Sequence, residues 1–382
     1  MAGEGIAAAA AALRLLSLGH VPRLITLGRV IPQGMEAIPE AAFPLIAELG
    51  LNDAVAQAGG RIVDGFENAW VPTASVLKPG RWLHIERRAF AVAAIRLALA
   101  RGAQISVVKR LPPIPRCCLA AVDATGRSAA WSRPIRRQGN QAADIFEISS
   151  TAERGRIERA PNGWTYRIGS TVGVVSTQQR RSAAPAGARF LGRRPAFPQW
   201  CENPIEGRRI AVGDAALAHD PLAGQGIRFA LASAFAAASV IQTWADKGDR
   251  EAARCFYRSF VAQARIRHLE FLEQRELDAA AGNPPLLPER VRFSGRSGLA
   301  ELSVDSHIVR GRAILLDGPT AVRWLGGVDL LQLQKLARKP IASAALLGEI
   351  AATGVESGRA SAILSWCLRK GVLTSAVTKM RQ

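Results

Sequence analysis

The sequence of 382 residues predicts an α/β fold with an inserted antiparallel sheet and a small C-terminal helical module. Near the N-terminus, a glycine turn at Gly3 and Gly5 precedes an apolar helix and then a short strand. An alternating stretch over 163–177 is typical of two paired antiparallel strands, which we expect to roof a pocket. Three short helical stretches follow residue 330 and indicate the C-terminal module.

The N-terminal residues match most of a βαβ unit that binds dinucleotides. A helix is expected from Ile6 to about Leu18, and a strand over Pro22–Leu27. Glycine in the turn lets the backbone approach a pyrophosphate, and the helix N-terminus favours negative charge. Two parts of the usual βαβ unit are not recognised in this sequence. There is no room for a strand before Gly3, and no acidic residue stands near Thr26, where such a unit usually grips a ribose.

Strands and helices then alternate with loops. We expect a loop-rich stretch over 29–81 that contains a helix around 41–49, a helix over 89–100, and strands over 104–108, 118–123 and 209–212. Long helices are expected over 226–246 and 250–277, and the helices of the C-terminal, winged-helix-like module over 330–338, 341–352 and 356–370. This order suggests a cofactor domain at 1–130 and 205–280, a β-sheet substrate region at 131–204, and the module at 290–382.

The most informative segment runs from Arg208 to Ile227. Its strand delivers Gly213-Asp214 at the C-terminal end, where α/β folds bind ligands, and an Asp there can accept hydrogen bonds from a ribose or ribityl hydroxyl. Pro221 stiffens the next turn. Gly224-Gln225-Gly226 then offers backbone N–H groups at the start of a long helix, where donors and helix dipole suit an electron-rich ligand.

This segment resembles the second flavin-binding motif of the FAD-dependent aromatic hydroxylases and halogenases. Further resemblances follow in family order: the glycine turn, the strand–Arg–helix segment at Arg87, and the "DATGR" strand over 122–127. The resemblance implies FAD, with Arg87 at the pyrophosphate or ribityl and Asp123 near the adenosine. The cofactor-binding residues that it implies are Gly3, Gly5, Arg87, Asp123, Gly213, Asp214, Pro221, Gly224, Gln225, Gly226 and Ile227.

The family's chemistry implies that the flavin activates dioxygen while the protein positions an electron-rich ring and excludes water. His219 and Asp220 lie beside the expected flavin face and are candidate acid/base groups, although packing of His219 and capping or bracing of the loop by Asp220 is the favoured interpretation. No nicotinamide domain is visible, so electrons are expected from transiently bound NAD(P)H or from a partner flavin reductase.

Halogenation is disfavoured because its motif is degraded. The family's "WxWxIP" stretch corresponds to 163–169, where Tyr166 replaces the second Trp and Gly169 replaces Pro. The halide-relaying lysine has only Lys78 as a loose counterpart. Trp164 and Tyr166 remain candidate catalytic residues, with core packing as the alternative.

The C-terminal module makes the expected substrate class more specific. A halogenase-like core, a degraded halogen motif and an extra C-terminal domain resemble flavoproteins that mature quinohemoprotein amine dehydrogenase by hydroxylating a peptidyl tryptophan. Such a resemblance implies an aromatic small molecule or a Trp-containing peptide or protein as substrate. The alternatives are a halogenase, an FAD-dependent alkene reductase and, more distantly, a DNA-binding regulator that uses the C-terminal module.

Composition limits the expected partners, metal sites and location of the protein. The formal net charge of +19 suits an acidic peptide or anionic cofactor, and it also reflects an Arg- and Ala-rich composition. Nucleic acid is not expected, because basic residues do not cluster on the third C-terminal helix. The five cysteines have no CxxC spacing, so neither zinc nor a disulfide framework is expected. No apolar run of membrane-spanning length is recognised, and a cytoplasmic protein is expected.

Overall fold

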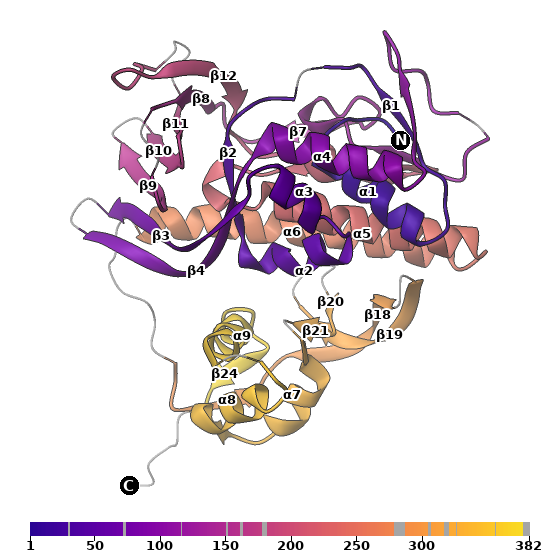
Figure 1. Cartoon of the computed structure of the whole chain (residues 1–382). Coiled ribbons are helices and arrows are strands. Elements are labelled where there is room, and N and C mark those ends of the chain that lie inside the picture. Colours follow the sequence, from indigo (N-terminus) through magenta and orange to yellow (C-terminus); the bar gives the residue numbers. More distant parts are fainter. Residues whose placement is uncertain are drawn as a thin grey trace, which may run out of the picture. The chain divides into compact units, whose positions relative to one another are not determined.

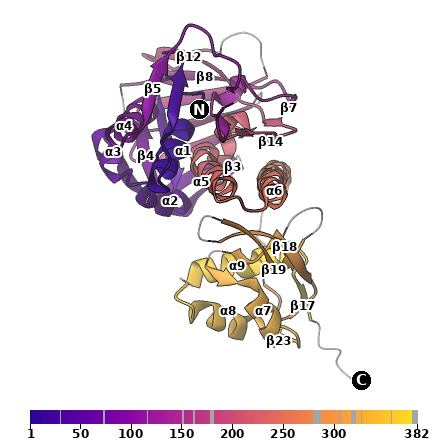
Figure 2. The same ribbon diagram turned by 90° about the vertical axis from the view of Figure 1, so that its right-hand side faces the viewer.

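The computed structural model (Figures 1 and 2) describes residues 1–29, 31–71, 74–115, 117–149, 152–160, 163–177, 182–278, 287–304, 307–316, 321–325, 327–355 and 357–376. The chain forms two compact units. The larger unit comprises Met1–Gly248 and Ala264–Ala281, and the smaller unit comprises Asp249–Gln263 and Gly282–Gln382.

A parallel sheet is the frame of the larger unit. It is assembled from β5 (Gln104–Val107), β1 (Arg23–Thr26), β6 (Ala121–Asp123), β15 (Arg209–Ala211) and, antiparallel at one end, β14 (Ile205–Glu206). Ala2 lies between β1 and β6 and forms parallel bridges to Ile25 and Asp123. Its N–H donates to the Val122 carbonyl over 2.9 Å. The expectation that the first strand is missing is therefore wrong: Met1 and Ala2 take its place, too short for a sequence pattern.

Three helices pack together beside this sheet. α1 (Ile6–Ser17) contacts both α4 (Arg87–Ala100) and α5 (Gly226–Ala245), as Figures 1 and 2 show. α1 buries a continuous run of alanines over 7–12, and these small side chains permit a close helix–helix approach. The sequence predicts all three helices, but not that α5 is long and apolar enough to span a membrane. In the structure, 67% of the most apolar window of α5 is buried inside the protein.

An eight-stranded sheet forms the second layer of the larger unit. Its order is β12-β8-β11-β10-β9-β3-β4-β2, antiparallel except between β3 and β9. The strands are β2 (Met35–Pro39), β3 (Arg61–Val71), β4 (Ala74–Glu86), β8 (Ala142–Glu147), β9 (Gly155–Ala160), β10 (Gly163–Ile168), β11 (Thr171–Ser176) and β12 (Arg189–Pro195). The expected strand pair over 163–177 is confirmed as β10 and β11.

Two expectations about this sheet need correction. The stretch 29–81 is not loop-rich, because it holds β2, β3 and most of β4. The sheet is also not confined to 131–204, since these three strands come from before it. The exposed faces of β3 and β4 carry Ile62, Val76 and Leu77, which obscure the alternation of apolar and polar residues.

Short elements complete the larger unit. They are α2 (Phe43–Glu48), α3 (Asn52–Gln57) and the small sheet of β7 (Ile135–Arg137), β13 (Gln199–Cys201) and β16 (Leu217–Ala218). The long helix α6 (Arg250–Asp278) contributes its first part to the smaller unit and its second part to the larger one.

The smaller unit contains three helices close to their expected positions: α7 (Leu330–Leu336), α8 (Ser343–Ala351) and α9 (Ser357–Arg369). They share one apolar core that includes Leu330, Leu346 and Leu364. The strands are β17 (Arg290–Phe293), β18 (Arg296–Val304), β19 (His307–Leu315), β20 (Ala321–Val322), β21 (Trp324–Leu325), β22 (Val328–Asp329), β23 (Ile341–Ala342) and β24 (Leu373–Ser375). β17 pairs with both β23 and β24, and β18 with β19 forms a long hairpin.

Asp123 fastens the loop that follows β6. Its side chain is fully buried, and its carboxylate accepts hydrogen bonds from the N–H and hydroxyl of Thr125 (3.1 and 2.7 Å), the N–H of Trp131 (2.9 Å) and the hydroxyl of Ser132 (2.7 Å). With these four donors, both carboxylate oxygens are occupied. Asp123 therefore shapes the loop over 124–132, and its expected place near the adenosine stays a prediction.

We predict that Asp123→Ala lowers the free energy of unfolding by about 3 kcal/mol or more, because it leaves several buried donors without an acceptor. Glu153→Ala is the control: this glutamate is exposed, so its loss should change stability by less than about 0.5 kcal/mol. Urea unfolding followed by circular dichroism measures both. Equal stability of the two variants would contradict the structural role of Asp123.

Candidate functional site

The candidate site begins where β15 ends, at Gly213. This glycine has a φ of +57°, and a Cβ placed on it would lie 2.7 Å from the Cβ of Ala7 and 3.6 Å from that of Ala230. Ala7 belongs to the first turn of α1, and Ala230 lies one turn into α5. Gly213 is thus the residue that brings the starts of two helices to the C-terminal end of a central strand, as expected for a ligand site in an α/β fold.

Both helix starts are open. In the part of the chain that the structure describes, a Cβ placed on Gly5 or on Gly226 would have no neighbouring atom within 4 Å, so the backbone there can be approached closely. Neither helix has a side-chain N-cap. The N–H groups of Ile6, Ala7 and Ile227 have no acceptor within the described residues. These donors, with the two helix dipoles, form sites for negative charge.

Gly3 plays a different role from Gly5. It adopts a φ of +135°, and a Cβ there would overlap the carbonyl group of Ala124. Glycine at this position therefore lets the turn after Ala2 pass the end of β6, whereas Gly5 keeps space free for a ligand.

A charged cluster surrounds Asp214, the residue after Gly213. Its carboxylate attracts both Arg87, at the start of α4, and Arg127, in the loop after β6. Arg87 also pairs with Glu36 over 2.9 Å, and its side chain remains 39% exposed. The three motif segments around residues 87, 127 and 214 therefore meet in space, as expected.

An acidic group does lie at the end of the second strand. Glu4, from the glycine turn, accepts a hydrogen bond from the hydroxyl of Thr26 and another from the N–H of Arg29 (3.1 Å). The expected gap near Thr26 is therefore filled from a different part of the chain. Carboxylates at this position suit the hydroxyl groups of a ribose.

The loop from His219 to Gly224 connects β16 to α5 and is held at three points. The His219 carbonyl accepts from the Arg127 guanidinium over 3.0 Å. The Asp220 N–H donates to Nε2 of His268, on α6, over 3.0 Å. The Asp220 carboxylate in turn accepts from the Leu222 N–H over 2.8 Å.

Burial controls the charge of this loop. It lowers the pKa of His219 to about 3 and that of His268 to about 4, with the neighbouring arginines acting in the same direction. It raises the pKa of Asp220 to about 6, although the hydrogen bond from Leu222 opposes that change. Both histidines are therefore neutral at physiological pH. Their rings form a T-shaped pair with centroids 4.7 Å apart. These contacts favour packing and bracing of the loop over the acid/base roles considered for His219 and Asp220.

An aromatic cluster lies beside the same loop. Leu222 packs into a core with Trp164, 6% exposed, and Tyr166 lies against it. The ring centroids of Trp164 and Tyr166 are 5.7 Å apart. Trp82 is in this group and lies 3.9 Å from the Cβ position of Gly224. The Trp82 indole N–H is buried without an acceptor in the described residues, which is expected of a donor that a ligand completes.

The remaining motif residues lie on the same loop and in the first turn of α5. Pro221 begins a short 3₁₀ turn, Gly224 has a φ of +58° at its end, and Gln225 precedes α5 and accepts from Arg228 over 3.1 Å. Ile227 follows Gly226 in the first turn of α5.

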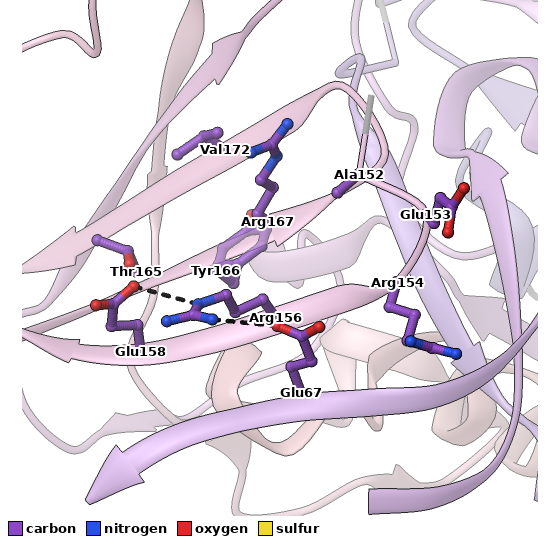
Figure 3. A pocket seen from close by; sticks show the side chains of 10 residues that line it. All are labelled: Glu67, Ala152, Glu153, Arg154, Arg156, Glu158, Thr165, Tyr166, Arg167 and Val172. Carbon is purple, nitrogen blue, oxygen red and sulfur yellow. Dashed lines mark hydrogen bonds and ion pairs between the residues drawn. The ribbon is translucent and has the colours of Figure 1, made fainter. Parts of the chain in front are cut away.

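A separate pocket of about 640 Å³ opens on the large sheet (Figure 3). Thr165, Tyr166 and Arg167 of β10 line it, so Tyr166 borders both this pocket and the aromatic cluster. Arg156 is paired there with Glu67 (3.1 Å) and Glu158 (3.4 Å), as the dashed lines in Figure 3 mark. This pocket does not include the loop over 219–224 and is not the candidate site.

Sequence reasoning missed three residues of the site. Arg127 stands in the "DATGR" segment, where the resemblance points to Asp123 instead. Trp82 opens the segment that contains Arg87. His268 has no metal-ligand spacing to draw attention to it, and only the fold brings it beside residue 220.

We predict that stability falls on acidification from about pH 7.5 to about pH 5.5, on the order of 3 kcal/mol. Three buried histidines with lowered pKa values, His84 (about 4), His219 and His268, bind protons only on unfolding in this range. Asp220, with a raised pKa, opposes them but is outnumbered. Urea midpoints at the two pH values measure the effect. An unchanged or higher midpoint at the lower pH would contradict it, and His268→Gln should reduce the pH dependence.

Comparisons with known proteins agree with this geometry. No family model matches the chain. The chain is 26% identical to LodB of Marinomonas mediterranea, which is described as a putative FAD-dependent oxidoreductase, over 31% of this chain and 42% of that protein. The chain thus spans less than half the length of this curated relative.

Solved structures extend the likeness to the whole chain. A peptidyl tryptophan dihydroxylase, QhpG, essential for tryptophylquinone cofactor biogenesis, has a TM-score of 0.66 at 19% identity and covers 97% of this chain and 98% of its own. CmlS, a flavin-dependent halogenase, has a TM-score of 0.68 at 15% identity, covering 100% and 96%. The brominase Bmp2 covers 68% of this chain and 82% of its own, with a TM-score of 0.59 at 16% identity. The chain therefore shares the fold of solved FAD-dependent monooxygenases and halogenases.

Proposed function

We propose that the chain is an FAD-dependent monooxygenase that hydroxylates an aromatic ring. One observation carries this proposal: two uncapped, open helix starts flank Gly213-Asp214 at the end of a central strand. That arrangement provides separate donor sets for a pyrophosphate and for a second electron-rich group of the same elongated ligand.

The residues of the site fit FAD. Glu4 would bind the adenosine ribose, the Gly5 turn and α1 the pyrophosphate, and Arg87 with Asp214 the ribityl region. Backbone N–H groups over 225–227 would face the flavin ring, beside the Trp82 indole N–H, which has no acceptor among the described residues. Bound FAD would supply dioxygen activation. The chain's own part would be to orient an aromatic ring against the wall of Trp164 and Tyr166 and to exclude water.

Two features favour hydroxylation over halogenation: the positions of the lysines, and the degraded halogenase motif at 163–169. Lys78 is exposed near the end of the β3–β4 hairpin, and Lys109 and Lys247 are exposed too. None of the lysines that the structure describes in the larger unit is buried beside the aromatic cluster. A halide-relaying lysine, which the halogenase resemblance would require, therefore has no counterpart among them.

A tryptophan within a peptide or protein is the proposed substrate, for maturation of a quinone cofactor. The whole-chain likeness to QhpG supports it, although CmlS is as similar. The net charge of +19 suits an acidic peptide around the reacting residue. NAD(P)H or a partner flavin reductase would supply the electrons.

Gly5→Val separates cofactor binding from folding. Because no atom of the described residues lies within 4 Å of the Gly5 side-chain position, we predict normal stability but an FAD Kd raised by about tenfold or more. Gly348→Ala is the matched control, since that glycine of α8 is equally unobstructed but lies in the smaller unit. Titration of the apoprotein with FAD, followed by flavin fluorescence, measures both. If the wild type binds no FAD, the proposal fails.

The second prediction concerns the product. With FAD, a reductant and dioxygen, Trp-containing acidic peptides should gain the mass of one or more oxygen atoms. Tyr166→Ala, which opens the aromatic wall, should lower the yield by about tenfold without abolishing FAD binding. Mass spectrometry in the presence of bromide distinguishes the outcomes: a brominated product would favour the halogenase alternative.

A further inference from the structure

His268 is the residue from α6 that reaches the loop over 219–224. It is 4% exposed, and its Nε2 accepts the hydrogen bond from the Asp220 N–H. This part of α6 belongs to the larger unit, as does the loop, so the contact lies within one compact body.

Asp220 organises the rest of the loop. Its carboxylate caps the short 3₁₀ turn at Pro221 by accepting from the Leu222 N–H, and Leu222 is then anchored in the aromatic cluster. Because its own N–H is buried, the position of Asp220 depends on an acceptor from outside the loop.

The hydrogen bond also specifies the chemical form of His268. A ring nitrogen that accepts from an N–H carries a lone pair, so Nε2 is unprotonated and the proton is on Nδ1. The surroundings maintain this neutral form. His219, also neutral, contributes an edge-to-face ring, Arg127 opposes added positive charge, and Asp220 presents its N–H to Nε2.

We propose that His268 is a positioning residue that fixes the loop over 219–224 in the shape required for the flavin ring. The inference rests on the proposed function for its purpose, but the hydrogen bond itself is testable without any cofactor. His268 contacts the loop from outside and is not assigned a role in the chemical step.

Two variants isolate the acceptor. His268→Leu keeps an apolar side chain of similar volume but leaves the Asp220 N–H without a partner. His268→Gln retains an amide oxygen at about the reach of Nε2 and should rescue the contact. Ile46→Val, a buried change elsewhere in the larger unit, controls for a general loss of stability.

The first measurement uses the apoprotein. Hydrogen exchange of peptides covering 219–224 should rise by about tenfold in His268→Leu and stay within about threefold of the wild type in His268→Gln and Ile46→Val. Exchange that is unchanged in His268→Leu, or raised equally in His268→Gln, would overturn the proposal. Should His268→Leu not fold, nitrogen NMR of ¹⁵N-histidine wild-type protein decides: a proton on Nε2 of His268 would overturn it.

The second measurement adds FAD. The Kd should rise by about tenfold in His268→Leu and by less than about threefold in His268→Gln, with a matching change in the visible flavin spectrum only in the former. Equal affinity of His268→Leu and wild type would refute a role toward the flavin. A wild type that binds no FAD would instead refute the proposed function and leave the exchange result to decide about the loop.

Discussion

The close approach at Gly213 is the constraint on which the rest of the site depends. A side chain there would meet Ala7 of α1, so only glycine allows the end of β15 to lie against the first turns of both α1 and α5. The buried alanines of α1 serve the same purpose, because they bring that helix close to α5 along its length. The small residues of two separate segments thus produce one result: two sets of N–H groups, without acceptors among the described residues, converge on the carboxyl end of the central sheet.

The site that results has two regions of contrasting polarity. Around Asp214 and Arg87 the side chains are charged, mutually paired and partly exposed. Around His219 and His268 they are neutral, buried and next to an aromatic cluster. An elongated ligand with an ionic end and a planar, apolar end would match both regions at once.

Most of the helices, and the glycines at the start of α5, could be predicted from the sequence. The helices α1, α5 and α6 carry clear periodicity, and Gly224 and Gly226 sit where a turn and a helix start require them. Local sequence patterns did not predict the features that depend on contacts between residues far apart in the sequence. Ala2 is too short a strand to have a pattern, β4 carries Pro79 and Gly80 within its span, and β3 exposes Ile62. The four donors to Asp123 could not be predicted either, because they come from a loop whose course the sequence does not specify. His268 lies 48 residues from Asp220 and could not be paired with it beforehand.

Arg127 connects the edge of the large sheet to the loop over 219–224. Its guanidinium donates at one end to the Phe197 carbonyl, over 2.8 Å, and at the other to the His219 carbonyl, over 3.0 Å. The first acceptor lies just beyond β12, an edge strand of the large sheet, and the second begins the loop that leads to α5. Since a guanidinium is planar and rigid, the two carbonyls keep a fixed separation. A molecule that docks on the sheet and displaces this edge would therefore also displace the loop, because the Arg127 side chain connects the two.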